Sequence, residues 1–162
     1  MIEIEALYRQ HASAVFRFAW GLCGDRSEAE DLVSETFVRL LARAPRIQTQ
    51  TALGYLLAIA RNVYLTGRRR RRREVPLPED LSGPDPALES QLDERADLDA
   101  VLRALGNMSE GERTALLLRV DHGLPYEEVA SLLGTSVGAV KVRVHRARMR
   151  LAGARRSQER KP

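Results

Sequence analysis

The spacing of the apolar residues limits what this chain can fold into. Leu, Val, Ile and Phe recur at intervals of three and four residues in both halves of the sequence, and strand patterns with a period of two are nearly absent. A period near 3.6 places such residues on one face of an α-helix. We therefore predict an all-α protein.

A proline-rich acidic segment divides the chain. Four of the seven prolines lie within 76–86, together with Gly83 and several acidic residues. Proline interrupts helices, so we predict a flexible linker at 74–86 between a helical bundle at 1–73 and a four-helix domain at 87–155, with a tail at 156–162. Domains of about 70 residues bury a low fraction of their surface, so each is expected to gain stability from a partner.

Capping residues predict where the helices begin and end. In the first half one helix ends near Gly24, a second begins with Ser27 as its cap, and a third runs from about Thr51 into six consecutive arginines at 68–73. The second helix is expected to bury Leu32, Val33, Thr36, Phe37, Leu40 and Leu41.

The second half shows the same kind of signals. Asp85-Pro86 predicts the start of a helix that ends at Gly106, and Ser109 with Glu112 forms a capping box for a helix that ends at Gly123. A short helix is expected at 126–133, followed by a turn and a last helix from Val137 to about Leu151.

Residues 126–140 have the spacing of a helix-turn-helix. Ala130 is small where two helices would cross, and Gly134 suits a left-handed turn. The last helix carries apolar residues on one face and cationic residues over the remainder, which suits a DNA major groove. The alternative is a plain helical hairpin with a solvated cationic face. The cationic residues are Lys141, Arg143, His145, Arg146, Arg148 and Arg150.

The net charge of +4 conceals a strong segregation along the chain. Residues 1–73 carry +6, residues 74–106 carry −7 and residues 107–162 carry +5. Of the 26 basic residues 24 are Arg, which favours bidentate contacts with phosphates and base edges, although nucleotide bias of the genome would have the same effect. The arginine run at 68–73 is either a solvated extension or, as the continuation of a folded helix, a phosphate-binding edge.

Several classes of protein are excluded by the sequence. Apolar runs are too short for a membrane span, and the first residues, Met1 to Glu5, are no signal peptide, so a soluble cytoplasmic protein is expected. The single Cys23 cannot form an internal disulfide. His11, His122 and His145 lie in different segments, and no nucleophile or phosphate-binding motif is present. We therefore expect no metal, no cofactor and no enzymatic activity.

Three segments, in this order, resemble the extracytoplasmic-function (group IV) sigma factors of bacterial RNA polymerase: residues 27–39, residues 57–63 with the arginines that follow, and residues 138–148. The resemblance implies a factor that directs RNA polymerase core to specific promoters. Its implied partners are the clamp coiled coil and flap of the core enzyme, promoter DNA and an anti-sigma factor.

The resemblance also implies roles for individual residues. The residues implied to face polymerase are Asp31, Leu32, Glu35 and Arg39. Those implied at the minus-ten element are Gln48, Thr49, Gln50, Arg61, Asn62, Arg68 and Arg69. Those implied at the minus-thirty-five element are Arg113, Arg119, Ser136, Gly138, Lys141, Arg143, His145 and Arg146.

Three other interpretations remain open from the sequence. A stand-alone helix-turn-helix regulator would need only residues 107–162, with the first part sensing a signal or dimerising. A helical interaction module would use its basic patches on an acidic partner. A nucleic-acid enzyme is disfavoured because a catalytic constellation is missing.

Overall fold

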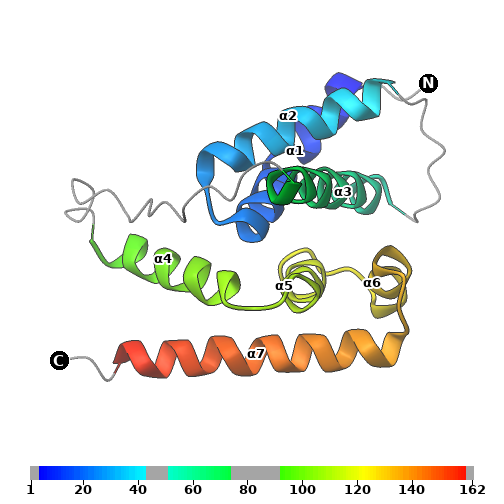
Figure 1. Ribbon diagram of the computed structural model, residues 1–162. Helices are drawn as coiled ribbons and strands as arrows, with labels where there is room; N and C mark the ends of the chain where they lie inside the picture. Colours follow the sequence, from blue (N-terminus) through cyan, green and yellow to red (C-terminus); the bar gives the residue numbers. More distant parts are fainter. Residues whose placement is uncertain (1–3, 43–50, 74–91, 160–162) are drawn as a thin grey trace.

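The computed structural model describes residues 4–42, 51–73 and 92–159, and these ranges contain helices and no strands (Figure 1). The prediction of an all-α protein is confirmed. The predicted linker at 74–86, the predicted start of a helix at Asp85-Pro86 and the predicted minus-ten residues Gln48 to Gln50 lie outside the described residues.

The N-terminal half contains three helices, α1 (Ile4–Cys23), α2 (Arg26–Ala42) and α3 (Ala52–Arg73). Gly24 ends α1 with a positive φ of 75°, as predicted. The predicted cap of α2 is wrong by two residues, because Asp25 Oδ1 accepts the hydrogen bond from the amide of Ser27 at 2.9 Å. Thr51 caps α3, since its hydroxyl accepts from the amide of Gly54 at 3.0 Å.

The C-terminal half begins with α4 (Leu92–Gly106), followed by α5 (Glu110–Leu116), which continues into a π-helical turn, η2 (Leu117–Asp121). The predicted capping residue Ser109 accepts a hydrogen bond from the amide of Glu112 at 3.2 Å. In η2 the amide of His122 donates to the carbonyl of Leu117, five residues earlier, at 3.1 Å. This wider turn was not anticipated from the sequence.

The helix-turn-helix prediction is confirmed by α6 (Tyr126–Leu133) and α7 (Val137–Glu159). Gly134 between them adopts the left-handed conformation with φ 65°. Ala130 is buried at the crossing of the two helices, and Val129 and Val140 fill the joint. The helix α7 continues eight residues beyond the predicted end at Leu151. In Figure 1 it runs beneath α4, α5 and α6.

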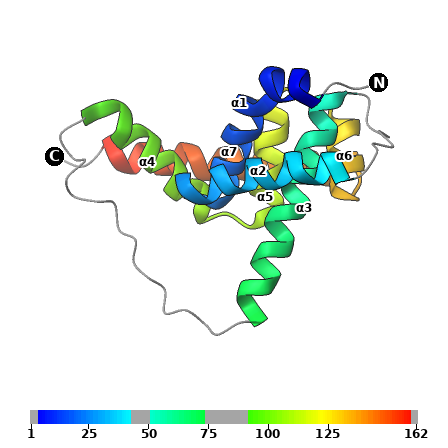
Figure 2. The same ribbon diagram turned by 90° about the horizontal axis from the view of Figure 1, so that it is seen from above.

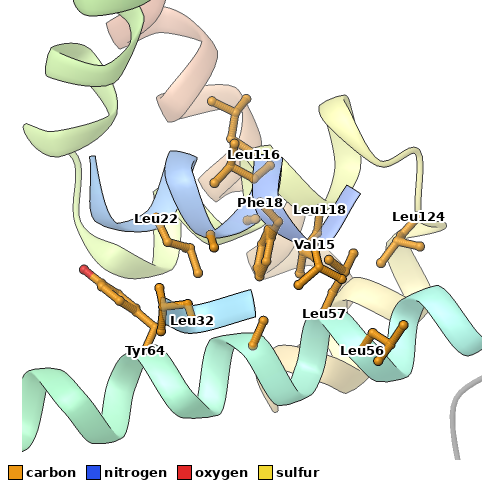
Figure 3. Packing of buried hydrophobic residues seen from close by; sticks show 14 of the residues in the cluster. Val15, Phe18, Leu22, Leu32, Leu56, Leu57, Tyr64, Leu116, Leu118 and Leu124 are labelled. Atoms are coloured by element: carbon orange, nitrogen blue, oxygen red, sulfur yellow. The ribbon is translucent and has the colours of Figure 1, made fainter. Parts of the chain in front are cut away.

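The two halves share one hydrophobic core. The helix α1 packs against α2 and α3 and also against α4, α5 and η2 of the other half. Phe18 of α1, Leu57 of α3 and Leu118 of η2 are fully buried in this common core (Figure 3). Each half was expected to need a partner, and in this structure the other half fills that place.

The end of α3 and one side of α2 lie outside this core. The arginine-bearing end of α3 extends away from the other helices (Figure 2). Leu41, predicted to be buried, is 63% exposed, and the nearby Val38 is 55% exposed. The apolar stripe of α2 is therefore wider than the surface that its neighbours cover, and α2 presents apolar side chains outward.

Candidate polymerase and nucleic-acid interfaces

The outward side of α2 carries charged and apolar residues together. Asp31 and Glu35 are exposed, and Glu35 pairs with Arg39, with 3.4 Å between the carboxylate and Nε. Val38 lies three residues after Glu35, which itself lies four residues after Asp31, so all three share one side of the helix. Leu32, by contrast, is buried in the core. The exposed Val38 and Leu41 were missed because helical spacing alone does not say which edge of a stripe is covered.

The residues of α3 predicted at the minus-ten element differ in their surroundings. Asn62 and Arg69 are exposed and Arg68 is half-buried. Arg61 instead forms an ion pair with Glu110 of α5, with Nε 3.0 Å from Oε1, and both side chains are only 18% exposed. This pairing, between residues 49 positions apart, has no signal in the local sequence.

The end of α3 is tied to α2 by an acidic residue. Arg71 forms an ion pair with Glu28, and the hydrogen bond with this carboxylate raises the pKa of Arg71 above its ordinary value. Glu28 belongs to the acidic first turn of α2, where its negative charge also interacts favourably with the helix dipole. It therefore has a structural partner that the sequence did not reveal.

Arg113, predicted near a DNA phosphate, is buried at the junction of the two halves. It is 6% exposed, and its guanidinium donates to the carbonyls of Leu105 and Met108 at 2.9 and 3.2 Å. It also donates to the carbonyl of Leu22 and to the hydroxyl of Tyr64, the latter at 3.1 Å. In this arrangement its guanidinium is engaged by protein acceptors from both halves.

Arg119 is half-buried beside the start of α6. Its guanidinium lies 4.1 Å from the ring centroid of Tyr126, within the range of a cation–π contact, and donates to the carbonyl of Leu124 at 3.1 Å. Lys141 of α7 reaches the same ring at 5.4 Å. The ring of Tyr126 therefore lies close to both Arg119 and Lys141, two cationic residues that the sequence predicts at the DNA.

The predicted recognition residues of α7 gather on its accessible side. Gly138, Lys141 and His145 follow one another at intervals of three and four and are exposed, as is Arg146. Arg143 is half-buried. Ser136 caps the helix, because its hydroxyl accepts from the amide of Ala139 at 3.1 Å. The buried side of α7 holds Val140, Val144 and Ala147.

The described part of the chain offers little for metal binding, membrane crossing or thiol chemistry. No group of three or more His, Cys, Asp or Glu residues there is placed to hold a metal ion, and no described helix is long and apolar enough to cross a membrane. Burial raises the pKa of the Cys23 thiol to about 11, which opposes formation of a thiolate. His122 packs edge-on against Phe18, and burial lowers its pKa.

Both halves match known families. Residues 7–74 match the family described as Sigma-70 region 2, and residues 98–151 match Sigma-70, region 4. The chain is 38% identical over 139 residues to the ECF RNA polymerase sigma factor EcfG of Rhodopseudomonas palustris, covering 83% of this chain and 75% of that protein. The chain belongs to the extracytoplasmic-function sigma factors. We refer to residues 7–74 as region 2 and to residues 98–151 as region 4.

Further sigma factors are similar over most of this chain. The ECF RNA polymerase sigma factor SigE of Mycolicibacterium smegmatis is 39% identical over 153 residues, covering 91% of this chain but only 59% of SigE. Among solved structures, the sigma factor RpoE of Bartonella quintana, in complex with the anti-sigma factor NepR, has a TM-score of 0.78 and 28% identity, covering 94% of this chain and 96% of RpoE. CnrH, in complex with the cytosolic domain of CnrY, shares the fold with a TM-score of 0.68 and 24% identity.

Proposed function

We propose that this sigma factor directs core RNA polymerase to specific promoters, with region 2 engaging polymerase and the minus-ten element and region 4 reading the minus-thirty-five element. The observation that carries the proposal is the presence of both regions in one chain, with a helix-turn-helix whose last helix exposes Lys141, His145 and Arg146. If the protein were a stand-alone regulator, residues 7–74 would have no role that explains their match to region 2.

For polymerase binding we propose the outward side of α2. Asp31, Glu35 and Arg39 would supply charged contacts, and the exposed Val38 and Leu41 would supply apolar area. Apolar side chains surrounded by charges are typical of the centre and rim of a protein interface. Leu32, being buried, would support this surface from within rather than touch the partner.

At the minus-ten element we propose different roles for α3 and for the residues that precede it in the sequence. Gln48, Thr49 and Gln50 would meet the unstacked base, and Asn62, Arg68 and Arg69 would follow the strand. Cationic contacts with the backbone combined with a pocket for a base are the usual means of holding single strands. Arg61 would join them only after it leaves Glu110.

At the minus-thirty-five element we propose that α7 enters the major groove. Lys141, Arg143, His145 and Arg146 would contact base edges or phosphates, with Ser136 and Gly138 at the start of the helix close to the backbone. Arg119 would contact a phosphate beside α6. Arg113 could do so only if region 4 left region 2, since acceptors of both hold it.

The protein would act in the cytoplasm by binding polymerase and promoter DNA, without covalent chemistry or a cofactor. RpoE of B. quintana was solved with the anti-sigma factor NepR, and by analogy we propose an anti-sigma partner here. To test the function, the purified protein is mixed with core polymerase and a genomic promoter library, and the transcripts are sequenced. Specific start sites absent from core polymerase alone are expected, and their absence would overturn the proposal.

A further inference from the structure

Val142 is an exposed apolar residue on the cationic side of α7. Its side chain is 47% exposed, and the exposed residues Lys141, His145 and Arg146 surround it. A valine in water contributes no hydrophobic stabilisation, and its branched side chain lowers the helix propensity relative to alanine. Single exposed apolar residues are common on protein surfaces, so the position of Val142 on the helix decides what it can do.

The helical spacing places Val142 opposite the buried side of α7. That side is formed by Val140, Val144 and Ala147. At 3.6 residues per turn each residue is rotated by about 100° from the one before it, so Val142 points about 170° away from the middle of the buried side. A partner that approaches the exposed side of α7 therefore lies directly over Val142.

The two sequence neighbours of Val142 lie at the edges of this exposed side. With the same rotation per residue, Lys141 points about 90° and Arg143 about 70° from the middle of the buried side, in opposite directions. The ammonium of Lys141 lies 5.4 Å from the ring centroid of Tyr126. The guanidinium of Arg143 lies against α5, 3.5 Å from the position of a Cβ built at Gly111. The two cationic residues therefore flank Val142, which occupies the middle.

The space beside Val142 is open toward the start of α7. Gly138 lies four residues earlier on the same side of the helix. A Cβ built at Gly138 would meet only the Ser136 hydroxyl, at 4.0 Å, and Gly138 has no positive φ. Neither packing nor backbone conformation requires this glycine, but it allows a partner to approach the backbone closely. Recognition helices contact base edges with residues near their N-terminus, and Val142 is in the second turn.

The chemistry of the major groove offers one group that suits Val142. Each base pair presents hydrogen-bond donors and acceptors there, which a valine cannot use, and thymine alone of the four bases adds an apolar group, its C5 methyl. We propose that Val142 is a specificity-determining residue that packs on the C5 methyl of a thymine in the minus-thirty-five element. This inference deepens the proposed function and rests on it. The cationic residues around Val142 favour DNA over an apolar protein partner.

The test removes the methyl group and the valine separately and together. A promoter is first taken from the transcription assay and amplified with unmodified nucleotides, so that thymine is its only source of a C5 methyl group. Duplexes are then made with uracil, which lacks only this methyl, at one thymine of the minus-thirty-five element at a time. The affinity of holoenzyme for each duplex is measured with the wild type and with Val142→Ala, whose helix propensity is higher.

The expected result is a coupling between Val142 and one thymine. For wild-type holoenzyme, uracil at that thymine should weaken binding about fourfold, because burying one methyl group is worth about 0.8 kcal/mol and 1.4 kcal/mol corresponds to tenfold. With Val142→Ala the same replacement should have almost no effect, since the residue that packs on the methyl is gone. Uracil at the other thymines should act alike on both proteins. Such non-additivity indicates a direct contact.

The matched control is Met149→Ala. Met149 is 62% exposed and lies seven residues after Val142 on the same side of α7, about 10 Å farther from the N-terminus. Holoenzyme with this variant should respond to each uracil as the wild type does. Circular dichroism checks that both variants remain helical.

Two results would overturn the inference while leaving the proposed function intact. One is an equal response of the wild type and Val142→Ala to every uracil, and the other is a minus-thirty-five element without thymine. Equal responses together with weaker capture of core polymerase in the absence of DNA would show that Val142 meets a protein instead. Missing start sites in the transcription assay would refute the proposed function itself, and the inference with it, before any uracil is introduced.

Discussion

Arg61 of region 2 and Glu110 of region 4 form an ion pair with 3.0 Å between Nε and Oε1. Burial acts to raise the pKa of Glu110, but hydrogen bonds from Arg61 and Thr114 outweigh it, and the pKa lies below its ordinary value. The carboxylate is therefore more stable in the folded protein than in the unfolded chain. Both side chains are mostly shielded from water, so the pair is screened less than a surface pair.

The first prediction concerns pH. A carboxyl group with a lowered pKa stabilises the fold above its unfolded pKa, and this contribution is lost as the pH falls through the folded pKa. Glu110→Gln should lower the free energy of unfolding by about 1 kcal/mol at neutral pH and by progressively less in acid. Urea unfolding of both proteins between pH 7 and pH 3 measures the difference. A difference independent of pH would contradict it.

The second prediction concerns the recognition helix. Arg143→Ala and Arg146→Ala should each weaken minus-thirty-five recognition, because removing a side chain that contacts a base edge costs about 1 to 3 kcal/mol. Footprinting of the holoenzyme on a promoter found in the transcription assay measures the loss. Arg155→Ala, an exposed position farther along α7, is the control. Unchanged footprints with both arginines replaced would reject the assignment.

The third prediction concerns polymerase binding. Asp31→Arg should reduce the affinity for core polymerase at least about tenfold, since it places a like charge opposite any cation that meets this surface. Its contacts with duplex DNA should be retained. Glu30→Arg makes the same change of charge one residue earlier, on a different side of α2, and should have a smaller effect. Capture of core polymerase at the wild-type level by Asp31→Arg would refute the prediction.

The fourth prediction concerns stability. Arg113→Met should lower the free energy of unfolding by about 3 kcal/mol, because it leaves buried carbonyls of both regions without a donor. Tyr64→Phe removes a single hydrogen bond of the same group and should cost about 1 kcal/mol. Arg103→Ala, at an exposed position on α4, should be neutral. If Arg113→Met is as stable as Arg103→Ala in urea unfolding, Arg113 does not hold the junction.

Much of the fold could be predicted because helix caps and turns are determined by residues close together in the sequence. The cap at Ser109, the left-handed Gly134 and the helix 126–133 all depend on neighbouring residues, and the structure confirms them. The second half of the predicted capping box is different, because the Glu112 carboxylate pairs with Arg150 of α7, with 3.1 Å between Oε2 and Nε. The cap of α2 was misplaced because Asp25 and Ser27 are both good caps. Which of the two is used depends on where Gly24 ends the preceding helix.

The contacts between the regions could not be predicted in the same way. Arg113 reaches a carbonyl 91 positions earlier, and a cation in a basic chain was more simply assigned to a phosphate. The exposure of Val38 and Leu41 depends on which neighbours cover α2. One signal was available and unused: Gly21 inside an apolar helix indicates a close approach by another element.

The π-helical turn η2 has an evolutionary consequence. Such turns add one residue to an α-helical register, and η2 presents Leu117 to Gly21. Deleting one codon within residues 117–121 would restore ordinary α-helical winding and turn the chain on one side of the deletion by about 100° relative to the other. A lineage of such proteins could therefore lose or regain the contact between Leu117 and Gly21 through a single small insertion or deletion.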